Sequence, residues 1–338
     1  MSLSYNIPFL SIMLTLVSGI LVPLIRREGG ALRLIRGVQL GVAGLSALLL
    51  VRLSGAGASF SYPMGYIPAP WGNELRAGPL EALLALTFSV VMLLSLSGGA
   101  EDLRRDVRPD RQGWYCLLMQ LLFGALLAMV YTDDLFTGYV FVEIAAVTAC
   151  IAVAAKESGR SVVAAIRYLI FSCLGSGLVL LGIAMLYCIT GQLLFSGLEE
   201  AVARLVQSGE YSLPLVVSAL LMTLGLSIKS AQFPFHDWLP DAHASATTAS
   251  SAILSGLVLK GYLVLLLKLI LRVFGPALIV STYIDDLLFL LGLTGMLFAS
   301  VAALRQEEVK RMIAYSSSAQ ISYIFLALGL GSEAGWTA

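Results

Sequence analysis

Four ionisable side chains lie in otherwise apolar stretches of the sequence, and their chemistry suits proton transfer. Lys229 and Lys260 lie in apolar runs, and both histidines, His236 and His243, fall between them. A cation near the middle of a membrane is costly, so it marks a functional site by default. Histidine titrates near neutral pH and can pass protons. The group predicts an ion pathway through a membrane.

Glu143 is the acidic residue expected to balance these cations. It lies about nine residues into the apolar run DLFTGYVFVEIAAVTACIAVA, roughly 14 Å deep at 1.5 Å per residue. Because two separate charges cost more in a membrane than an opposite pair, we expect Glu143 to approach Lys229. Burial disfavours a charged lysine and a nearby carboxylate favours it, so the protonation of Lys229 would follow the position of Glu143.

Each of these residues also has a purely structural interpretation. Lys229 could extend its side chain to the membrane surface, Glu143 could bond a hydroxyl group of a neighbouring helix, and each histidine could be a buried polar residue. A zinc site formed by the histidines with Asp237 and Asp241 is formally available. The two aspartates are instead expected to be caps or turn formers around Pro240. We therefore expect no metal and no cofactor.

The composition is that of a membrane protein. Of the 338 residues, 58% are hydrophobic and 12% are charged, whereas soluble domains carry about 25% charged residues. The formal net charge is zero, which gives no reason to expect a nucleic-acid partner.

About ten apolar segments are long enough to span a membrane as helices, which takes about 20 residues each. The sequence thus predicts an all-α polytopic membrane protein. Segment seven should be broken between about Ser230 and Asp241, because Pro234 lacks an N–H group and clashes with the preceding turn. The Gly- and Pro-rich loop 54–78 is predicted to form a hairpin on the membrane surface. The segments are 4–25, 31–53, 79–99, 113–132, 134–155, 161–190, 212–232, 250–274, 283–304 and 308–331.

The basic residues predict the orientation. Connections after odd-numbered segments hold most of the 21 lysines and arginines, and connections rich in such residues face the cytoplasm. The N-terminus is therefore predicted to lie outside. Segment 4–25 is expected to be a retained span rather than a signal peptide.

Five blocks of the sequence resemble the antiporter-like proton-channel family. Its members are the large membrane subunits of respiratory complex I, their counterparts in membrane-bound hydrogenases, and subunits A and D of Mrp-type Na⁺/H⁺ antiporters. The blocks are DDLFTGYVFVEI around Glu143, RYLIFSCLGSGLVLLGIAMLYCITG at 167–191, KSAQFPFHDWLPDAH at 229–243, LSGLVLKGY around Lys260, and EEVKRMIAYSSSAQISYIFLALGLG at 307–331.

The resemblance implies roles for three of the charged residues. Glu143 corresponds to the family's glutamate on the fifth helix, Lys229 to the lysine on the broken seventh helix, and Lys260 to the lysine on the eighth. It also implies three leading helices followed by two inverted five-helix repeats. We therefore expect leading helices and an outer loop at 1–110, a complete first repeat at 111–275, and the start of the second repeat at 276–338.

The sequence departs from the family pattern in two ways. An Ala-Pro pair usually follows the DAH block, but here the residues are Ser245-Ala246-Thr247-Thr248, so the broken helix is expected to differ locally. The sequence also ends during the second repeat. A truncated reading frame, a split gene and a fragment are all compatible with that end.

The resemblance implies a proton-translocating or cation/proton antiport subunit in the cytoplasmic (inner) membrane of a prokaryote. Its partners would be other membrane subunits, the lipid bilayer and protons, with Na⁺ as a second candidate ion. The alternative is a structural or assembly subunit that keeps the fold without transport. The sequence predicts no redox or hydrolytic site of its own. In a complex I-like assembly, the chain would be the pumping subunit of an NADH-quinone-type or hydrogenase-type oxidoreductase.

Overall fold

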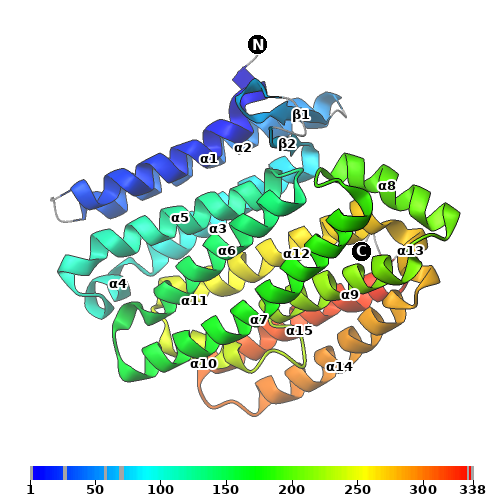
Figure 1. The fold of residues 1–338 in the computed structure, drawn as a ribbon. Coiled ribbons are helices and arrows are strands. Elements are labelled where there is room, and N and C mark those ends of the chain that lie inside the picture. Colours follow the sequence, from blue (N-terminus) through cyan, green and yellow to red (C-terminus); the bar gives the residue numbers. More distant parts are fainter. Residues whose placement is uncertain (1–2, 26–28, 57–58, 68–71, 333–334, 336–338) are drawn as a thin grey trace. The chain divides into compact units, whose positions relative to one another are not determined.

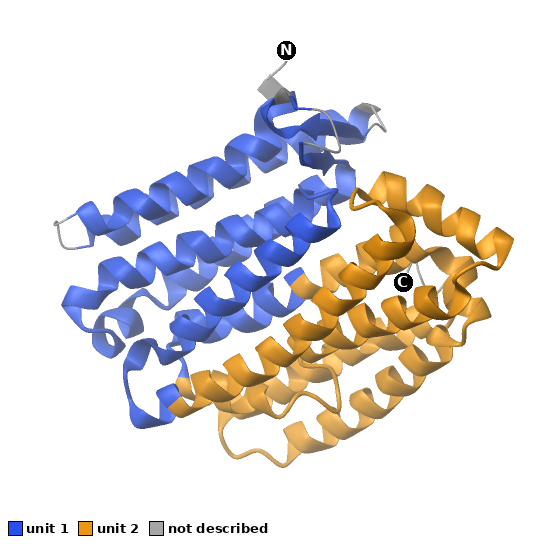
Figure 2. Cartoon of the chain, in the orientation of Figure 1, with its two compact units in different colours: residues 1–162, 246–261 blue, residues 163–245, 262–338 orange. Residues whose placement is uncertain are grey.

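The computed structural model describes residues 3–25, 29–56, 59–67, 72–332 and 335. The described chain is almost entirely helical (Figure 1), which confirms the predicted all-α class. It divides into two compact units (Figure 2), residues 1–162 with 246–261 and residues 163–245 with 262–338. Two helices, α7 (Gly159–Thr190) and α12 (Leu259–Lys268), have residues in both units. The predicted repeat at 111–275 stays a prediction.

The first unit contains the N-terminal helices and a short hairpin. In it, α1 packs against α2 and α5, α2 against α3, and α5 against α6. Its elements are α1 (Leu3–Leu21), η1 (Val22–Leu24), α2 (Gly30–Ala56), β1 (Phe60–Pro63), η2 (Met64–Tyr66), β2 (Glu74–Ala77), α3 (Pro79–Gly98), α4 (Ala100–Asp106), η3 (Pro109–Arg111), α5 (Gln112–Tyr131), α6 (Leu135–Val153), η4 (Ala154–Lys156), α11 (Thr248–Ile253) and the π-helical turn η5 (Leu254–Val258).

A buried chain of polar side chains joins α1, α2 and α5. Gln120 Nε2 donates to Ser18 Oγ at 2.7 Å, and Gln39 Nε2 donates to Gln120 Oε1 at 3.3 Å. All three side chains are buried. Polar groups inside a membrane protein need protein partners where water is absent, so these bonds help to fix how the three helices pack.

The predicted hairpin in the loop 54–78 is present. Strands β1 and β2 pair antiparallel, with Phe60 opposite Ala77. The hairpin is tied to α1 because the Tyr5 hydroxyl donates to the Ser61 carbonyl at 3.2 Å. It is tied to the connection between α5 and α6 because Asp133 N donates to the Glu74 carbonyl at 3.0 Å. Residues 57–58 and 68–71 of the loop lie outside the described residues.

The second unit is built from long helices and an interrupted segment. In it, α14 packs closely against α15, and α10 also lies against α15. Its elements, besides most of α7 and α12, are α8 (Phe195–Ser208), α9 (Ser212–Lys229), α10 (Trp238–Ser245), the π-helical turn η6 (Leu269–Phe274), α13 (Gly275–Ser281), α14 (Ile284–Leu304) and α15 (Val309–Gly329).

Helix α8 lies between the predicted membrane segments 161–190 and 212–232, where the sequence analysis predicted no helix. Its buried residues recur every three to four positions, on one face, while its charged residues are exposed. The helix was missed because it is amphipathic rather than uniformly apolar. The buried residues are Phe195, Leu198, Ala201 and Val202.

Helix α9 ends at Lys229, and helical structure resumes at Trp238. Ala231 adopts the left-handed conformation, with φ of 57°. The N–H groups of Ala231 and Gln232 return to carbonyls of the last turn at 3.2 and 3.0 Å, which closes the helix end. The interruption is shorter than the expected span from Ser230 to Asp241. Pro240 fits the first turn of α10, where a backbone N–H has no intrahelical acceptor.

Within the described residues, nine helical stretches are long and apolar enough to cross a membrane. The tenth predicted segment, 308–331, forms α15, a helix of 21 residues. It is not among the nine because the serines at 316–318 and Gln320 dilute its apolar residues. The predicted total of ten spans stays a prediction.

Glycines allow α7 and α9 to pack at close range. A Cβ atom added at Gly175 would lie 2.7 Å from the Gly225 carbonyl oxygen and 3.0 Å from Lys229 Cγ. A Cβ atom added at Gly225 would lie 2.5 Å from the Gly175 carbonyl oxygen. Small residues at such contacts are the usual way for membrane helices to approach closely.

We predict that Gly175→Ala destabilises the protein by about 1–3 kcal/mol, because the added methyl group must push the two backbones apart. The control is Gly177→Ala on the same helix, where an added Cβ meets no atom of the described structure within 4 Å. That variant should be neutral or slightly stabilising, since alanine favours helix by about 0.5–1 kcal/mol over glycine. Thermal unfolding in detergent checks both, and equal midpoints would contradict the prediction.

Candidate ion-translocation site

Lys229 is the most deeply buried cation of the candidate site. It is the last residue of α9, and only 1% of its surface is exposed. Its Nζ donates to Ser172 Oγ on α7 at 3.0 Å and lies 5.7 Å from the centroid of the Tyr262 ring. The C-terminal end of a helix favours a cation, and an aromatic face does so too. The side chain is therefore held inside the unit rather than extended from its surface.

The interruption after Lys229 is fixed by α14 and α15. The Ser318 hydroxyl donates to the Ala231 carbonyl at 3.0 Å. Gln232 accepts from the Ser322 hydroxyl at 3.0 Å and donates to the Leu291 carbonyl at 2.8 Å. Backbone groups released where a membrane helix breaks need such partners. The polar residues that dilute α15 therefore include those that stabilise the end of α9.

The two histidines lie on either side of the start of α10. His236 precedes the helix and packs against Phe233 and Tyr315, with ring centroids 5.4 and 5.7 Å away. His243 lies in the last turn of α10 and is fully buried. Because helical structure begins only at Trp238, the histidines do not share one continuous helix face. The spacing of seven residues would have given them a common face only on an unbroken helix.

Asp241 joins three helices of the second unit. It lies in the first turn of α10, as expected of a helix-start residue. It also accepts from the guanidinium groups of Arg167 on α7 and Arg311 on α15. Charge-assisted bonds of this kind are stronger than neutral ones. The sequence analysis did not predict this cluster.

Aromatic residues connect the Lys229 environment with the start of α10. The rings of Tyr168 and Trp238 are stacked at 4.3 Å, and the hydroxyls of Tyr168 and Tyr262 are 3.4 Å apart. Tyr262 is also the ring beside Lys229. Ser172, Tyr168 and Tyr262 are functional candidates that the sequence analysis missed. The only feature of the sequence that could have identified them is that each places a hydroxyl group inside an apolar segment.

Lys260 lies in the first unit, at the start of α12. Its Nζ donates to the Ser255 carbonyl at 2.8 Å. Ser255 belongs to the π-helical turn η5, in which Leu259 N–H bonds the Leu254 carbonyl, five residues back. Turns of this kind inside α-helices are frequent at functional sites. The π turn therefore brings a backbone carbonyl within reach of the lysine.

Glu143 also lies in the first unit, on α6, and is partly exposed there. Helix α6 begins at Leu135. The side chain of the preceding residue, Asp134, accepts a hydrogen bond from Thr137 N at 2.6 Å. Asp134 thus has the helix-start role that its position predicts. Glu143 and Lys229 belong to different units, so their approach stays a prediction.

Among the described residues, no group of three His, Cys, Asp or Glu side chains is placed to hold a metal ion.

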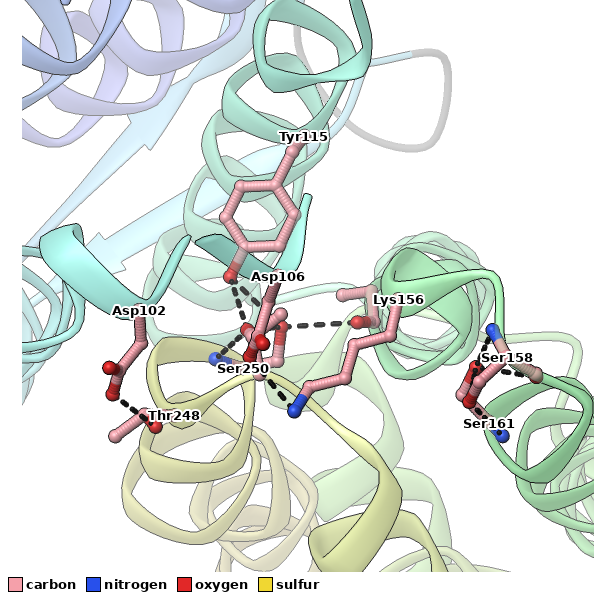
Figure 3. A network of polar contacts seen from close by, with 10 residues as sticks. Asp102, Asp106, Tyr115, Lys156, Ser158, Ser161, Thr248 and Ser250 are labelled. Atoms are coloured by element: carbon pink, nitrogen blue, oxygen red, sulfur yellow. Dashed lines mark hydrogen bonds and ion pairs between the residues drawn. The ribbon is translucent and has the colours of Figure 1, made fainter. Parts of the chain in front are cut away.

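A network of hydroxyl groups holds the start of the helix that leads to Lys260 (Figure 3). Thr247 caps α11, since its Oγ1 accepts from Ser250 N at 3.1 Å. Ser250 Oγ lies 2.9 Å from the Tyr115 hydroxyl and donates to the Ala152 carbonyl at 3.1 Å. The network thus joins α5, α6 and α11. The Thr247 cap lies in the Ser245–Thr248 stretch, where the sequence analysis expected the broken helix to differ locally.

Two further contacts surround this network (Figure 3). Thr248 Oγ1 donates to Asp102 Oδ2 on α4 at 2.7 Å, and Lys156 Nζ pairs with Asp106 Oδ2 at 2.8 Å. Asp102 and Asp106 both lie on α4. The small helix α4 is therefore bonded both to the start of α11 and to the connection between α6 and α7.

The fold and the site define a polytopic helical membrane protein with lysines buried among its helices. Residues 132–338 match the family model described as NADH:quinone oxidoreductase/Mrp antiporter, transmembrane. The chain belongs to this family. That membership confirms the resemblance recognised from the sequence blocks.

Individual relatives agree with the family model. The chain is 35% identical over 298 residues to NADH-quinone oxidoreductase subunit N of Desulforudis audaxviator, covering 85% of this chain and 58% of that protein. The chain thus spans less than two thirds of the length of this curated relative.

Solved structures share the fold. A chain of the archaeal membrane-bound sulfane sulfur reductase complex superposes with a TM-score of 0.83 at 28% identity, covering 96% of this chain and 65% of that one. A chain of the Mrp complex from Dietzia sp. superposes with a TM-score of 0.86 at 21% identity, covering 99% and 61%. At 21% identity, the similarity to the Mrp chain shows a shared fold and nothing more.

We predict that Tyr115→Phe loosens the start of α11, because it removes the hydroxyl that bonds Ser250 and lies 3.4 Å from Thr247 Oγ1. The expected loss of stability is about 0.5–1.5 kcal/mol, with faster amide hydrogen exchange across 248–253. Tyr323→Phe is the control, since that side chain is 45% exposed. Unchanged exchange at 248–253 would show that the network does not hold the helix.

We predict that Asp241→Asn destabilises the second unit by about 1–2 kcal/mol, because two guanidinium groups lose their charged acceptor. Asp237→Asn in the same block is the matched control, since its side chain is 76% exposed, and it should change stability by less than about 0.5 kcal/mol. Thermal unfolding in detergent gives both values. If both variants unfold at the same temperature, the cluster is not stabilising.

Proposed function

We propose that the chain is a proton-translocating, or cation/proton antiport, membrane subunit of a multisubunit complex. The candidate complexes are of the respiratory complex I, membrane-bound hydrogenase or Mrp antiporter type. The proposal draws on the family membership and on relatives whose names describe an oxidoreductase subunit, a respiratory membrane complex and an Mrp complex. Its partners would be other membrane subunits.

One observation carries the proposal, namely the burial of Lys229 at the end of an interrupted helix. Lys229 is an ionisable side chain that is 1% exposed and that donates to Ser172 from the last turn of a membrane helix. If the residue at this position had only a structural role, an apolar side chain would cost less free energy to bury in the membrane than a lysine. The cost of the lysine is explained if its proton is the transported ion.

In the proposed mechanism, a proton rests on Lys229 and then moves through water and histidine toward Lys260. The step occurs when Glu143 changes its position relative to Lys229, driven by partner subunits. Moving one charge against 100 mV requires about 2.3 kcal/mol. A change of two units in the pKa of a lysine corresponds to roughly 2.7 kcal/mol. The two free energies are therefore of compatible size.

The orientation and location complete the proposal. The basic connections favour a cytoplasmic face after the odd-numbered segments and an N-terminus outside. The location would be the cytoplasmic (inner) membrane of a prokaryote. Protons are the first candidate ion, and Na⁺ is the second.

We predict that Lys229→Ala in the assembled complex abolishes most of the coupled proton or Na⁺ flux into membrane vesicles, because the residue that carries the proton is missing. Flux is measured with a pH-sensitive or Na⁺-sensitive dye in vesicles. Assembly is checked separately by purification of the complex.

The control is Arg305→Ala, which removes a positive charge from an exposed position after α14 and should leave flux unchanged. Full flux in an intact Lys229→Ala complex would reject the transport proposal and favour a structural or assembly subunit.

A further inference from the structure

A cavity of about 450 Å³ opens in the first unit near the start of α2. Its size falls within the range of sites that hold small organic groups. Polar and apolar residues both contribute to the wall, in keeping with a position at the end of membrane helices. The lining includes Gly29, Leu32, Arg104, Gln112 and Cys116.

One arginine lines this cavity, and two more lie near its lining residues at the start of α2. Arg104 lines it, and its guanidinium nitrogen lies 3.5 Å from the place a Cβ atom of Gly29 would occupy. Arg33 Nε donates to the Gly29 carbonyl at 3.3 Å. Arg36 follows the lining residue Leu32 by four positions on α2, so both lie on the same face of the helix.

Among the residues that the structure describes, these arginines differ from their neighbours in having no acidic partner in an ion pair. Nearby Arg105 pairs with Glu101 at 2.5 Å, and Arg108 pairs with Glu157 at 2.9 Å. Within the described part of the chain, no carboxylate forms an ion pair with Arg33, Arg36 or Arg104. Arg36 also has a buried Nε group that finds no acceptor among the described residues, although its Nη2 donates to the Leu96 carbonyl at 3.0 Å.

We propose that this cavity binds the phosphate group of an anionic phospholipid. The cavity lies between the start of α2, the small helix α4 and the start of α5, and both α2 and α5 belong to candidate membrane spans. A cavity at the ends of membrane spans lies at the level of the lipid headgroups, so we take the phosphate to be that of a lipid. Guanidinium groups bind phosphate oxygens in forked geometry, and basic pockets between membrane helices on the cytoplasmic side are suited to anionic headgroups. The acyl chains would lie along the exposed apolar side chains of α1, η1 and α2, which include Ile20, Leu24 and Leu40.

The test measures binding of phosphatidylglycerol to the purified full chain by native mass spectrometry. The variant is Arg33→Gln with Arg104→Gln, and both side chains are exposed, so folding should be preserved. Each arginine near a membrane surface contributes about fivefold to the binding of an anionic lipid, so the double variant should bind roughly 25-fold more weakly. The matched control is Arg105→Gln with Arg108→Gln, which removes the same charge and should change binding less than about twofold, since both arginines already have acidic partners.

Two further arms identify the ligand without any variant. The wild-type chain should bind phosphatidylglycerol more tightly than phosphatidylcholine, and inorganic phosphate at the same concentration should not displace the lipid. Equal binding of the two lipids, or equal losses in the two double variants, would overturn the proposal. If inorganic phosphate displaces the lipid, the cavity is a site for a free anion, and the proposal of a lipid site is overturned.

Discussion

The interior of a membrane offers no water to a polar group, and this constraint governs most of the polar contacts in the chain. Lys229 is accommodated by a hydroxyl, an aromatic face and the end of a helix. The Ala231 carbonyl released after it accepts from Ser318 on α15, and the Gln232 side chain in the interruption bonds Ser322 and the Leu291 carbonyl. The partners of the broken segment lie in the neighbouring helices α14 and α15. The helices α14 and α15 are therefore part of the site even though they carry none of the predicted proton-bearing residues.

The features predicted from the sequence were those that depend on local chemistry. Long apolar runs predict helices, and Pro234 predicts that a helix ends shortly before it, as α9 does at Lys229. The hairpin follows from glycine, proline and aromatic residues between two spans. The burial of Lys229 follows from the apolar residues on either side. In each case the deciding residues are close in sequence, so no knowledge of packing was required.

The features that were missed depend on residues far apart in sequence. Ser172 and Tyr262 contact Lys229, and Arg167 and Arg311 contact Asp241, only because particular helices are neighbours. An apolar segment containing a serine gives no indication of which helix that serine faces. The amphipathic helix α8 was missed for another reason, because a half-buried helix has a lower mean hydropathy than a membrane span. The extent of the interruption was overestimated because proline in a first turn does not break a helix.

The π turn η5 determines where Lys260 points. A π turn holds one residue more than the α-helical turn it replaces, and each residue of an α-helix rotates the chain by about 100°. Everything after Leu254–Val258 is therefore rotated relative to a regular helix continuing from α11. Loss of a single residue in this turn would leave composition, hydropathy and helix length almost unchanged. It would nevertheless turn Lys260 toward a different neighbour, so the direction of this charge is encoded in the residue count of one helical turn.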